Sequence, residues 1–531
     1  MSNIIIGGGI TGLYLAYRLT NNDINSANYI AILEKTSRLG GRIHTHIMNE
    51  HVMDIGAARF NLNHNLLIKL LEELGLENHI IKIPNKKHYY INGHYFKSDR
   101  KLLEYFNIDR HTSIKTLWEE IYELVDIYGK EYLSKFTIGK FIQAHFGVDI
   151  SNLLKYSLGY TSKFSNTNAY TAFAALKQDY GITGKSFYVL DGGMEQIIDK
   201  LEKILTQRGV QILLNHEIKT INKSSNVIVV NNGLTAQQMR YDNLFICTDI
   251  NSLSAIKNTG LTKYTLNSVE GSSLMRIYAV YPKVNGKVWF DDTPKILTNG
   301  KMQFIVPINK NTGLIMVSYS TDLNADYWNH IPSKANLITK ITENLRQIFP
   351  HKNIPKPKFI SSHYWKKGIH NWVPNSNINK VYNDVNKKMI NNIFILGEIF
   401  SNHHAWIEGG LQTVHDNLEK VKIVNNNLEF LELKKTNKTL KTNKTLKTIS
   451  LSELKKHSTS KSIWTYITDR HSKIKYVYDL TEWQYEHPGG AMPILSIAGK
   501  DGTKKFYGMS AHPIDKIEKN ILPKYRIGLL D

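Results

Sequence analysis

The stretch Ile4-Ile5-Ile6-Gly7-Gly8-Gly9-Ile10-Thr11-Gly12 is the most informative part of the sequence. Its apolar start predicts a strand buried in a parallel sheet, and the apolar segment from Leu13 to Leu19 predicts a helix directly after it. Each glycine suits such a connection. Gly7 permits a tight turn, Gly9 lets a phosphate group approach the backbone, and Gly12 lets the helix pack against the strand. The N–H groups at the start of the helix would then face the phosphate.

A second apolar run, Ile30-Ala31-Ile32-Leu33, ends at Glu34, which lies 22 residues after Gly12. A carboxylate at this distance can accept hydrogen bonds from the ribose hydroxyl groups of a dinucleotide. Strand, turn, helix and acid together favour a dinucleotide-binding α/β domain over a glycine-rich surface turn. They do not distinguish FAD from NAD.

Further motifs resemble the flavin-containing amine oxidases, a family that includes monoamine, polyamine and L-amino-acid oxidases. The resemblance covers most of residues 1–425 and rests on Leu39-Gly40-Gly41-Arg42-Ile43-His44-Thr45, Asp54-Ile55-Gly56-Ala57-Ala58-Arg59-Phe60, Asp191-Gly192-Gly193-Met194, Glu217-Ile218, Ile395-Leu396-Gly397-Glu398 and Trp406-Ile407-Glu408-Gly409-Gly410-Leu411. It implies FAD as the cofactor. The residues that it places around FAD, together with Gly7, Gly9, Gly12 and Glu34, are Gly40, Gly41, Arg42, Gly56, Ala57, Ile218, Gly397, Glu398 and Ile407.

The resemblance also indicates where a substrate would lie. Family members transfer a hydride equivalent from a carbon that bears nitrogen to FAD, and the cofactor supplies that chemistry. Trp406 corresponds to one wall of the family's aromatic cage, unless it is simply a core aromatic residue. The opposite wall, usually a tyrosine, falls near Gly368-Ile369-His370-Asn371-Trp372, where His370 or Trp372 would replace it. No cysteine stands at about Ile369, so FAD should be bound non-covalently.

Two arginines bear on the reaction. Arg59 matches the position at which L-amino-acid oxidases grip the substrate carboxylate, or it contacts FAD phosphate or backbone instead. Arg276 replaces the family's lysine, which holds a water near flavin N5. Because arginine stays protonated and cannot shuttle a proton, the replacement argues against ordinary oxidase turnover and fast reaction with oxygen. Alternatively, Arg276 simply pairs with a carboxylate.

The C-terminal segment carries a second set of motifs. His487 stands in Glu486-His487-Pro488-Gly489-Gly490, and His512 follows 25 residues later. Two imidazoles on loops can ligate opposite faces of a haem iron, which then transfers electrons and does not activate oxygen. The segment from Ser450 resembles cytochrome b5, which implies haem b with His487 and His512 as axial ligands. Ala511 replaces the usual glycine before the second ligand. The alternative is a b5-like fold that has lost haem and binds a steroid or a protein.

The predicted fold class is α/β, with an FAD-binding Rossmann-like domain, an interleaved α+β substrate domain and a small α+β cytochrome b5-like domain. The hexapeptide Thr436–Lys441 repeats at once as Thr442–Lys447, and its many lysines and few apolar residues predict an extended linker. A basic helix lying on a membrane would need a broad apolar face, which this segment lacks. The predicted ranges are 1–62, 185–265 and 376–425 for the FAD-binding domain, 63–184 and 266–375 for the substrate domain (a helical insertion plus an antiparallel sheet), 426–448 for the linker and 449–531 for the haem domain.

Composition limits the remaining possibilities. The chain has 531 residues, too many for one core, and a single cysteine, Cys247, which excludes an intramolecular disulfide or a cysteine-ligated metal site. The net charge of +21 is spread along the chain beside abundant asparagine and isoleucine, so we do not expect nucleic-acid binding. No signal peptide, anchor or apolar run of about 18 residues is evident, which predicts a soluble cytoplasmic protein. His44, His46, His403 and His404 lack suitably spaced carboxylate or thiol partners, so no metal site is expected beside the haem.

These features favour an FAD-dependent oxidoreductase of the amine-oxidase type. Its substrate would be an amine or an amino acid, and electrons would be relayed to or from the haem domain and an external redox protein. Two alternatives remain open: an FAD-dependent desaturase or isomerase of the same fold, and a catalytically degenerate two-module binding protein.

Overall fold

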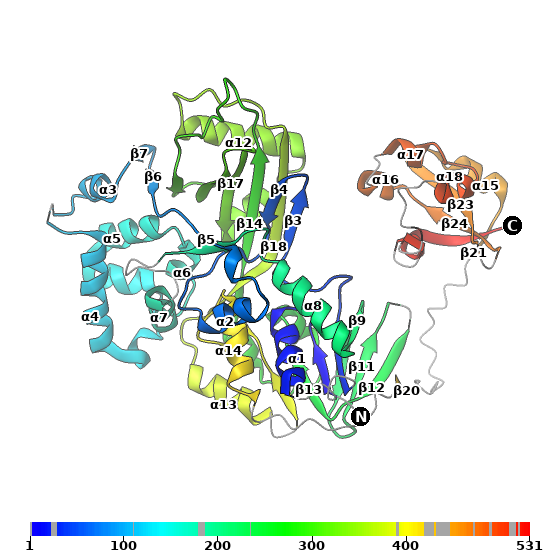
Figure 1. Cartoon of the computed structure of the whole chain (residues 1–531), viewed down its shortest axis with the longest axis horizontal. Helices are drawn as coiled ribbons and strands as arrows, with labels where there is room; N and C mark the ends of the chain where they lie inside the picture. The colour runs from blue at the N-terminus through cyan, green and yellow to red at the C-terminus, as the bar shows by residue number, and fades with distance from the viewer. Residues whose placement is uncertain are drawn as a thin grey trace. The chain divides into compact units, whose positions relative to one another are not determined.

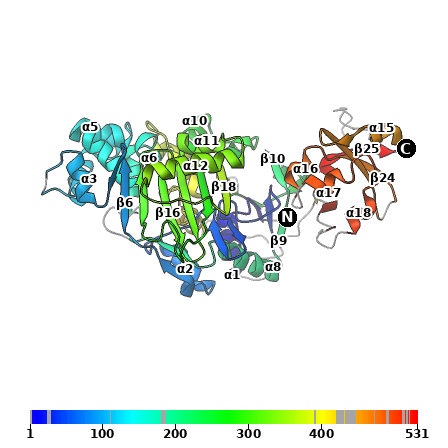
Figure 2. The same cartoon turned by 90° about the horizontal axis from the view of Figure 1, so that it is seen from above.

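The computed structural model describes residues 3–22, 29–109, 111–178, 186–233, 235–388, 392–418, 430–431, 447–470, 473–487, 491–508, 514, 517–518 and 521–531. The chain separates into two compact units, Met1–Leu433 and Lys434–Asp531. Figure 1 and Figure 2 show the helices and strands of each unit.

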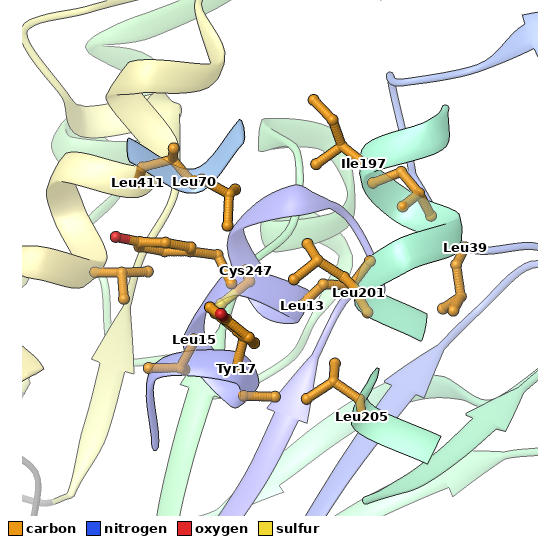
Figure 3. Close-up of a cluster of buried hydrophobic side chains, with 14 of the residues drawn as sticks. Leu13, Leu15, Tyr17, Leu39, Leu70, Ile197, Leu201, Leu205, Cys247 and Leu411 are labelled. Atoms are coloured by element: carbon orange, nitrogen blue, oxygen red, sulfur yellow. The ribbon is translucent and has the colours of Figure 1, made fainter. Parts of the chain in front are cut away.

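A five-stranded parallel sheet forms the centre of the nucleotide-binding half of the first unit. Its strand order is β19 (Ile393–Ile395), β13 (Asn243–Ile246), β1 (Asn3–Ile6), β2 (Ile30–Glu34) and β9 (Gln211–Leu214). Successive side chains of a strand point to opposite faces of a sheet. Ile5 therefore packs with the helices on one face, and Ile4 and Ile6 pack on the other. These helices are α1 (Ile10–Asn22), α8 (Gln196–Arg208) and α14 (Ile407–His415); Figure 3 shows their leucines with Cys247 between them.

The other face of the parallel sheet is covered by an antiparallel sheet. Its strands are β10 (Glu217–Asn222), β11 (Val227–Asn231), β12 (Ala236–Arg240) and β20 (Phe430–Leu431). Ile221, Ile228 and Met239 of this sheet are fully buried against the parallel strands. Strand β20 lies inside the range 426–448 that the sequence predicted as linker. Phe430 and Leu431 pair with β12 because it otherwise has a free edge.

A seven-stranded, largely antiparallel sheet forms the other half of the first unit. Its order is β18 (Phe359–Trp372), β14 (Val269–Val280), β17 (Leu314–Thr321), β16 (Phe304–Asn309), β15 (Lys295–Thr298), β6 (Lys87–Ile91) and β7 (His94–Phe96). One face packs on α11 (Asp322–Asn329) and α12 (Lys334–Ile348) through Met275 and Ile277 of β14. A helical block lies beside this sheet: α3 (Asp99–Tyr105), α4 (Ile114–Leu133), α5 (Ile138–Leu158), α6 (Thr161–Ser165) and α7 (Ala169–Gln178).

Helix α2 (Asn65–Glu73) departs from the predicted domain boundaries. The sequence placed it in the substrate domain 63–184, but Leu67, Leu70 and Leu71 are buried in the core of the nucleotide-binding half. Helix α2 packs there because the N–H groups at its start bind a side chain of the nucleotide-binding half. The N–H groups of Leu66 and Leu67 donate to the carboxylate of Glu408 in α14, each at 3.0 Å. The pattern of leucines predicted the helix but not the surface on which it packs.

Short elements connect these layers. They are β3 (Thr45–Met48), β4 (His51–Asp54), η2 (Glu77–His79), β5 (Ile80–Lys82), β8 (Tyr188–Leu190), α9 (Ile250–Ala255), α10 (Lys263–Asn267), α13 (Ile378–Lys388) and η4 (Glu398–Phe400). In the part of the chain that the structure describes, no helix is both long and apolar enough to cross a membrane.

The second unit is a small α+β domain. Its five-stranded sheet has the order β21 (Lys447–Ile449), β25 (Arg526–Leu530), β24 (Lys475–Asp479), β23 (Ser462–Thr468) and β22 (Ser458–Thr459). Its helices are α15 (Leu451–Lys456), α16 (Trp483–Glu486), α17 (Ala491–Leu495), α18 (Thr503–Tyr507) and α20 (Leu522–Tyr525). At the other end of the predicted linker, Lys447 and Thr448 pair with β25. The rest of the hexapeptide repeat lies outside the described residues.

Candidate functional site

A cavity of about 580 Å³ lies at the carboxyl ends of the parallel strands, where dinucleotides bind in open α/β sheets. Gly7 after β1, Glu34 at the end of β2, Cys247 after β13 and Gly397 after β19 all line it. The other residues that the sequence placed around FAD and that line this same cavity are Gly9, Gly40, Gly41, Arg42, Gly56, Ala57, Ile218, Glu398 and Ile407. Gly12 does not line it. The structure therefore gathers residues from both ends of the first unit around one space.

The glycines of the first turn are required for different reasons. A Cβ on Gly7 would lie 2.4 Å from the Cys247 carbonyl oxygen, and one on Gly12 would lie 2.1 Å from the Gly7 carbonyl oxygen. A Cβ on Gly9 would meet no protein atom within 4 Å. The protein's own packing thus requires Gly7 and Gly12, whereas Gly9 leaves open space beside the cavity into which a pyrophosphate would fit.

Two helix N-termini and one carboxylate complete the nucleotide end of the cavity. Ile10 and Thr11 at the start of α1, and Ile407 at the start of α14, line it, so both positive helix ends face a site suited to an anionic dinucleotide. The Glu34 carboxylate is held in place by the N–H groups of Gly8 and Thr36, each at 2.8 Å. These residues fit FAD.

An ion pair between a half-buried arginine and a buried glutamate joins three segments beside the cavity. Arg42 Nη1 lies 2.6 Å from Glu398 Oε1 and donates to the carbonyl of Gly368 at 3.2 Å. His370, on β18, donates from Nδ1 to Glu398, and its Nε2 accepts from the N–H of Ile250 at 3.3 Å. Burial alone would raise the pKa of Glu398, but Arg42 and His370 hold that pKa well below its ordinary value. Glu398 is therefore ionised, and its charge is fixed before any ligand binds.

His370 and Trp372 do not form the predicted second wall of an aromatic cage. His370 is fully buried behind Glu398, and Trp372 is 1% exposed, stacked on His404 with ring centroids 5.5 Å apart. Neither lines the cavity. His370 is turned toward the Glu398 carboxylate, and the indole N–H of Trp372 donates to the Ser401 carbonyl at 3.3 Å. We interpret His370 as a residue that positions the Glu398 carboxylate and not as a wall of the cavity.

Three of the four aromatic residues that wall the cavity were not among those that the sequence indicated. Tyr160 before α6, Tyr319 of β17 and Trp365 of β18 line the cavity together with Trp406, which is 7% exposed. Trp406 stacks on Phe187 at 6.0 Å. Tyr319 lies opposite Arg276 in the β14–β17 register, a pairing that no local motif announces. Only the register of the two strands, which local sequence patterns do not reveal, places Tyr319 beside Arg276.

Arg59 and Arg276 both reach this end of the cavity. Nη1 of Arg276 donates to the backbone oxygen of Asp54 at 2.7 Å, and its guanidinium carbon lies 4.9 Å from the centre of the Tyr319 ring. Arg59 donates to the Tyr160 hydroxyl and lies 5.7 Å from the same Tyr319 ring. Neither arginine forms an ion pair with a carboxylate among the described residues. The predicted alternative in which Arg276 merely pairs with a carboxylate therefore has no support in that part of the chain.

The second unit presents one of the two predicted haem ligands. His487 ends α16 with its N–H donating to the Trp483 carbonyl at 2.9 Å, and its ring meets the Trp483 ring edge-on. Trp483 packs on an apolar cluster that contains Leu480, Ile494 and Phe506. A half-buried imidazole beside such a cluster is an environment that fits haem. His512, Pro488–Gly490, Ala511 and Pro513 lie outside the described residues, so ligation by two histidines stays a prediction.

Comparison with known proteins identifies the family. Residues 10–414 match the family model for flavin-containing amine oxidoreductases. The chain belongs to this family. Residues 450–531 match the cytochrome b5-like heme/steroid binding domain. FAD and haem are accordingly the cofactors of this flavin amine oxidoreductase, and the α/β fold class predicted from the sequence is confirmed.

Individual relatives differ in how much of the chain they cover. An L-amino-acid oxidase from Sistrurus catenatus edwardsii is 23% identical over 80% of this chain and 87% of its own length. A flavin-containing amine oxidase A from Bos taurus is 30% identical over 24% of this chain, and the match spans only 23% of that relative. A Delta(8)-fatty-acid desaturase from Helianthus annuus is 40% identical over 12% of each chain. A solved structure assigned as a protoporphyrinogen oxidase from Exiguobacterium shares the fold, with a TM-score of 0.59 and 15% sequence identity. The match covers 79% of this chain and 98% of that chain.

Proposed function

We propose that this flavin amine oxidoreductase oxidises an amine or an amino acid and passes the electrons to its own haem unit. The main support is the cavity, which joins the dinucleotide end to a chamber walled by Tyr160, Tyr319, Trp365 and Trp406 and reached by Arg59 and Arg276. We propose non-covalent FAD, because the chain's single cysteine, Cys247, lies at the dinucleotide end in the core, where burial raises the pKa of its thiol.

When bound, FAD supplies the two-electron acceptor, and the side chains of the protein bind and orient the substrate. The aromatic walls exclude water and hold the C–H bond in place. Arg59 offers two N–H groups to a carboxylate. Arg276 holds its proton, so it cannot take one from the substrate. The substrate amine must therefore bind in its neutral form or lose its proton to solvent.

The haem unit supplies an alternative to oxygen as electron acceptor. Oxidation of one substrate molecule releases two electrons and a haem accepts one, so each turnover requires two transfers, and an external redox protein reoxidises the haem after each of them. The absence of a lysine at position 276 supports this route, since the arginine argues against fast turnover with oxygen.

Anaerobic stopped-flow mixing with a panel of amines and amino acids tests the proposal. We expect the flavin absorption to bleach first and the haem band to shift to the reduced form afterwards. The matched variant His487→Ala should bleach with the same rate constant and show no haem reduction. Bleaching of the wild type without haem reduction would exclude the relay. No bleaching with any amine or amino acid would exclude amine oxidation and favour a desaturase or an isomerase.

A further inference from the structure

The chamber beside the dinucleotide end holds two guanidinium groups on one aromatic ring. Arg276 lies opposite Tyr319 in the β14–β17 register, and the guanidinium carbons of Arg276 and Arg59 lie 4.9 Å and 5.7 Å from the centre of the Tyr319 ring. Arg59 also lies 5.0 Å from the Tyr160 ring and 4.9 Å from the Phe187 ring. Two cations thus share one largely apolar wall.

Neither guanidinium forms an ion pair with a carboxylate among the described residues. Arg276 is 6% exposed, its Nη1 binds a backbone oxygen, and its Nε has no hydrogen-bond partner in the described part of the chain. The nearby Asp54 carboxyl accepts from the Thr45 hydroxyl and from the N–H of Met194. Burial raises its pKa to about 6, so it is ionised at pH 7 and partly offsets the charge of Arg276. Burial likewise raises the pKa of Tyr160 to about 12, so that phenol is neutral at physiological pH.

A buried lysine, Lys295, lies near Arg59. Lys295 of β15 pairs with Lys87 of β6 across the sheet. Burial, with Arg59 and Lys87 nearby, lowers the pKa of Lys295 to about 7. The acidic residues of the cavity, Glu34, Glu217, Asp249 and Glu398, belong to its dinucleotide end, and Glu398 is already paired with Arg42. The chamber end of the cavity is therefore lined by two arginines and by none of the acidic side chains that line the cavity.

A charge that is withdrawn from water without a counterion is unfavourable, and a bound counterion removes much of that cost. One carboxylate held by Arg59 would leave Arg276 with only the partial compensation from Asp54. We propose that Arg59 and Arg276 together bind a substrate that carries two carboxylate groups, so that the preferred substrate is an acidic amino acid. This inference rests on the proposed function for its amine but not for its two anionic groups.

Ligand binding without turnover tests the site. The FAD-loaded full chain is titrated with glutarate and with butyrate at equal ionic strength, and the perturbation of the flavin spectrum gives each Kd. We expect glutarate to bind at least tenfold more tightly than butyrate. Arg276→Met and Arg59→Met should each abolish this preference, and Arg276→Lys should retain part of it. Arg100→Gln, which removes a half-buried cation in the helical block that does not line the cavity, is the matched control and should leave both Kd values unchanged.

The outcomes separate this inference from the proposed function. Equal Kd values for glutarate and butyrate in the wild type, or a preference that survives Arg276→Met in protein with full FAD content, would overturn it. If Arg276→Met fails to retain FAD, Arg59→Met decides: a lost preference supports the anion site, and an unchanged preference with full FAD content contradicts it. Tight glutarate binding without flavin reduction by any amino acid would reject the proposed function and keep the site. Faster flavin reduction by neutral than by acidic amino acids would reject the preference for acidic substrates and keep the proposed function.

Discussion

At the residue scale, the glycines of the first turn separate folding from cofactor binding. Gly9→Ala adds a methyl group where no protein atom lies within 4 Å, so we expect the apoprotein to keep its Tm while FAD affinity falls at least tenfold. Gly12→Ala places a Cβ 2.1 Å from the Gly7 carbonyl oxygen, so we expect about 2 kcal/mol or more of lost stability in the apoprotein itself. Thermal unfolding and FAD titration of both variants measure the two effects. Equal loss of Tm in both variants would contradict this division.

His404 gives the protein a pH dependence. It is fully buried on Trp372, its Nε2 donates to the carbonyl of Ile399 at 2.7 Å, and burial lowers its pKa to about 3. The unfolded chain takes up this proton near pH 6.5 and the folded chain does not. The free energy of unfolding therefore falls as pH drops below 6.5, by about 2 kcal/mol at pH 5 relative to pH 7.

Urea unfolding of His404→Gln at pH 5 and pH 7 checks the size of this effect. The variant keeps an N–H donor for Ile399 and should lose about 2 kcal/mol less stability on acidification than the wild type. His94→Gln, at an exposed site, should behave as the wild type does. An unchanged difference between the two pH values in His404→Gln would show that this histidine does not titrate as its burial predicts.

At the element scale, alternation along β14 decides which side chains build the core and which reach the cavity. Met275 and Ile277 pack on α11 and α12, while Leu274 and Arg276 line the cavity on the opposite face. This follows from the twofold period of a strand. A shift of register by one residue would bury the guanidinium of Arg276 in the core, so the apolar residues that hold the helices also hold the arginine in place.

The start of α2 depends on a residue more than 300 positions away in sequence. The Glu408 carboxylate, 4% exposed, accepts from the N–H groups of Leu66 and Leu67 at the positive end of the helix. Glu408→Gln removes the charge and turns an amide toward one of these donors, so we expect a loss of about 1–3 kcal/mol. Glu72→Gln, an exposed change in the same helix, should cost less than about 0.5 kcal/mol. Urea titration followed by tryptophan fluorescence compares them, and equal costs would refute the capping role.

At the scale of the whole molecule, the two units have separate hydrophobic cores. The first contains Leu13, Leu201 and Leu411 among others, and the second contains Ile463 and Phe506. We expect His487→Ala to remove the haem spectrum and leave the FAD content of the full chain unchanged, because its ligand position belongs to the second unit alone. Absorption spectra of the purified wild type and variant give the ratio of haem to protein and the ratio of FAD to protein. Loss of FAD together with haem would show that the cofactor sites depend on each other.

The sequence by itself determined the modules of this protein. Its glycine turn, Glu34, the flavin-family motifs and the motif around His487 are local patterns, and each encodes chemistry through residues close together in the chain. Tertiary structure decided how distant segments meet. It placed His370 behind Glu398 and not in the cavity wall, added Tyr160, Tyr319 and Trp365 to that wall, moved α2 to the nucleotide-binding core, and left Arg59 and Arg276 facing one ring. The physical reason is that strand register and the pairing of buried charges depend on contacts across the fold, which no local pattern records.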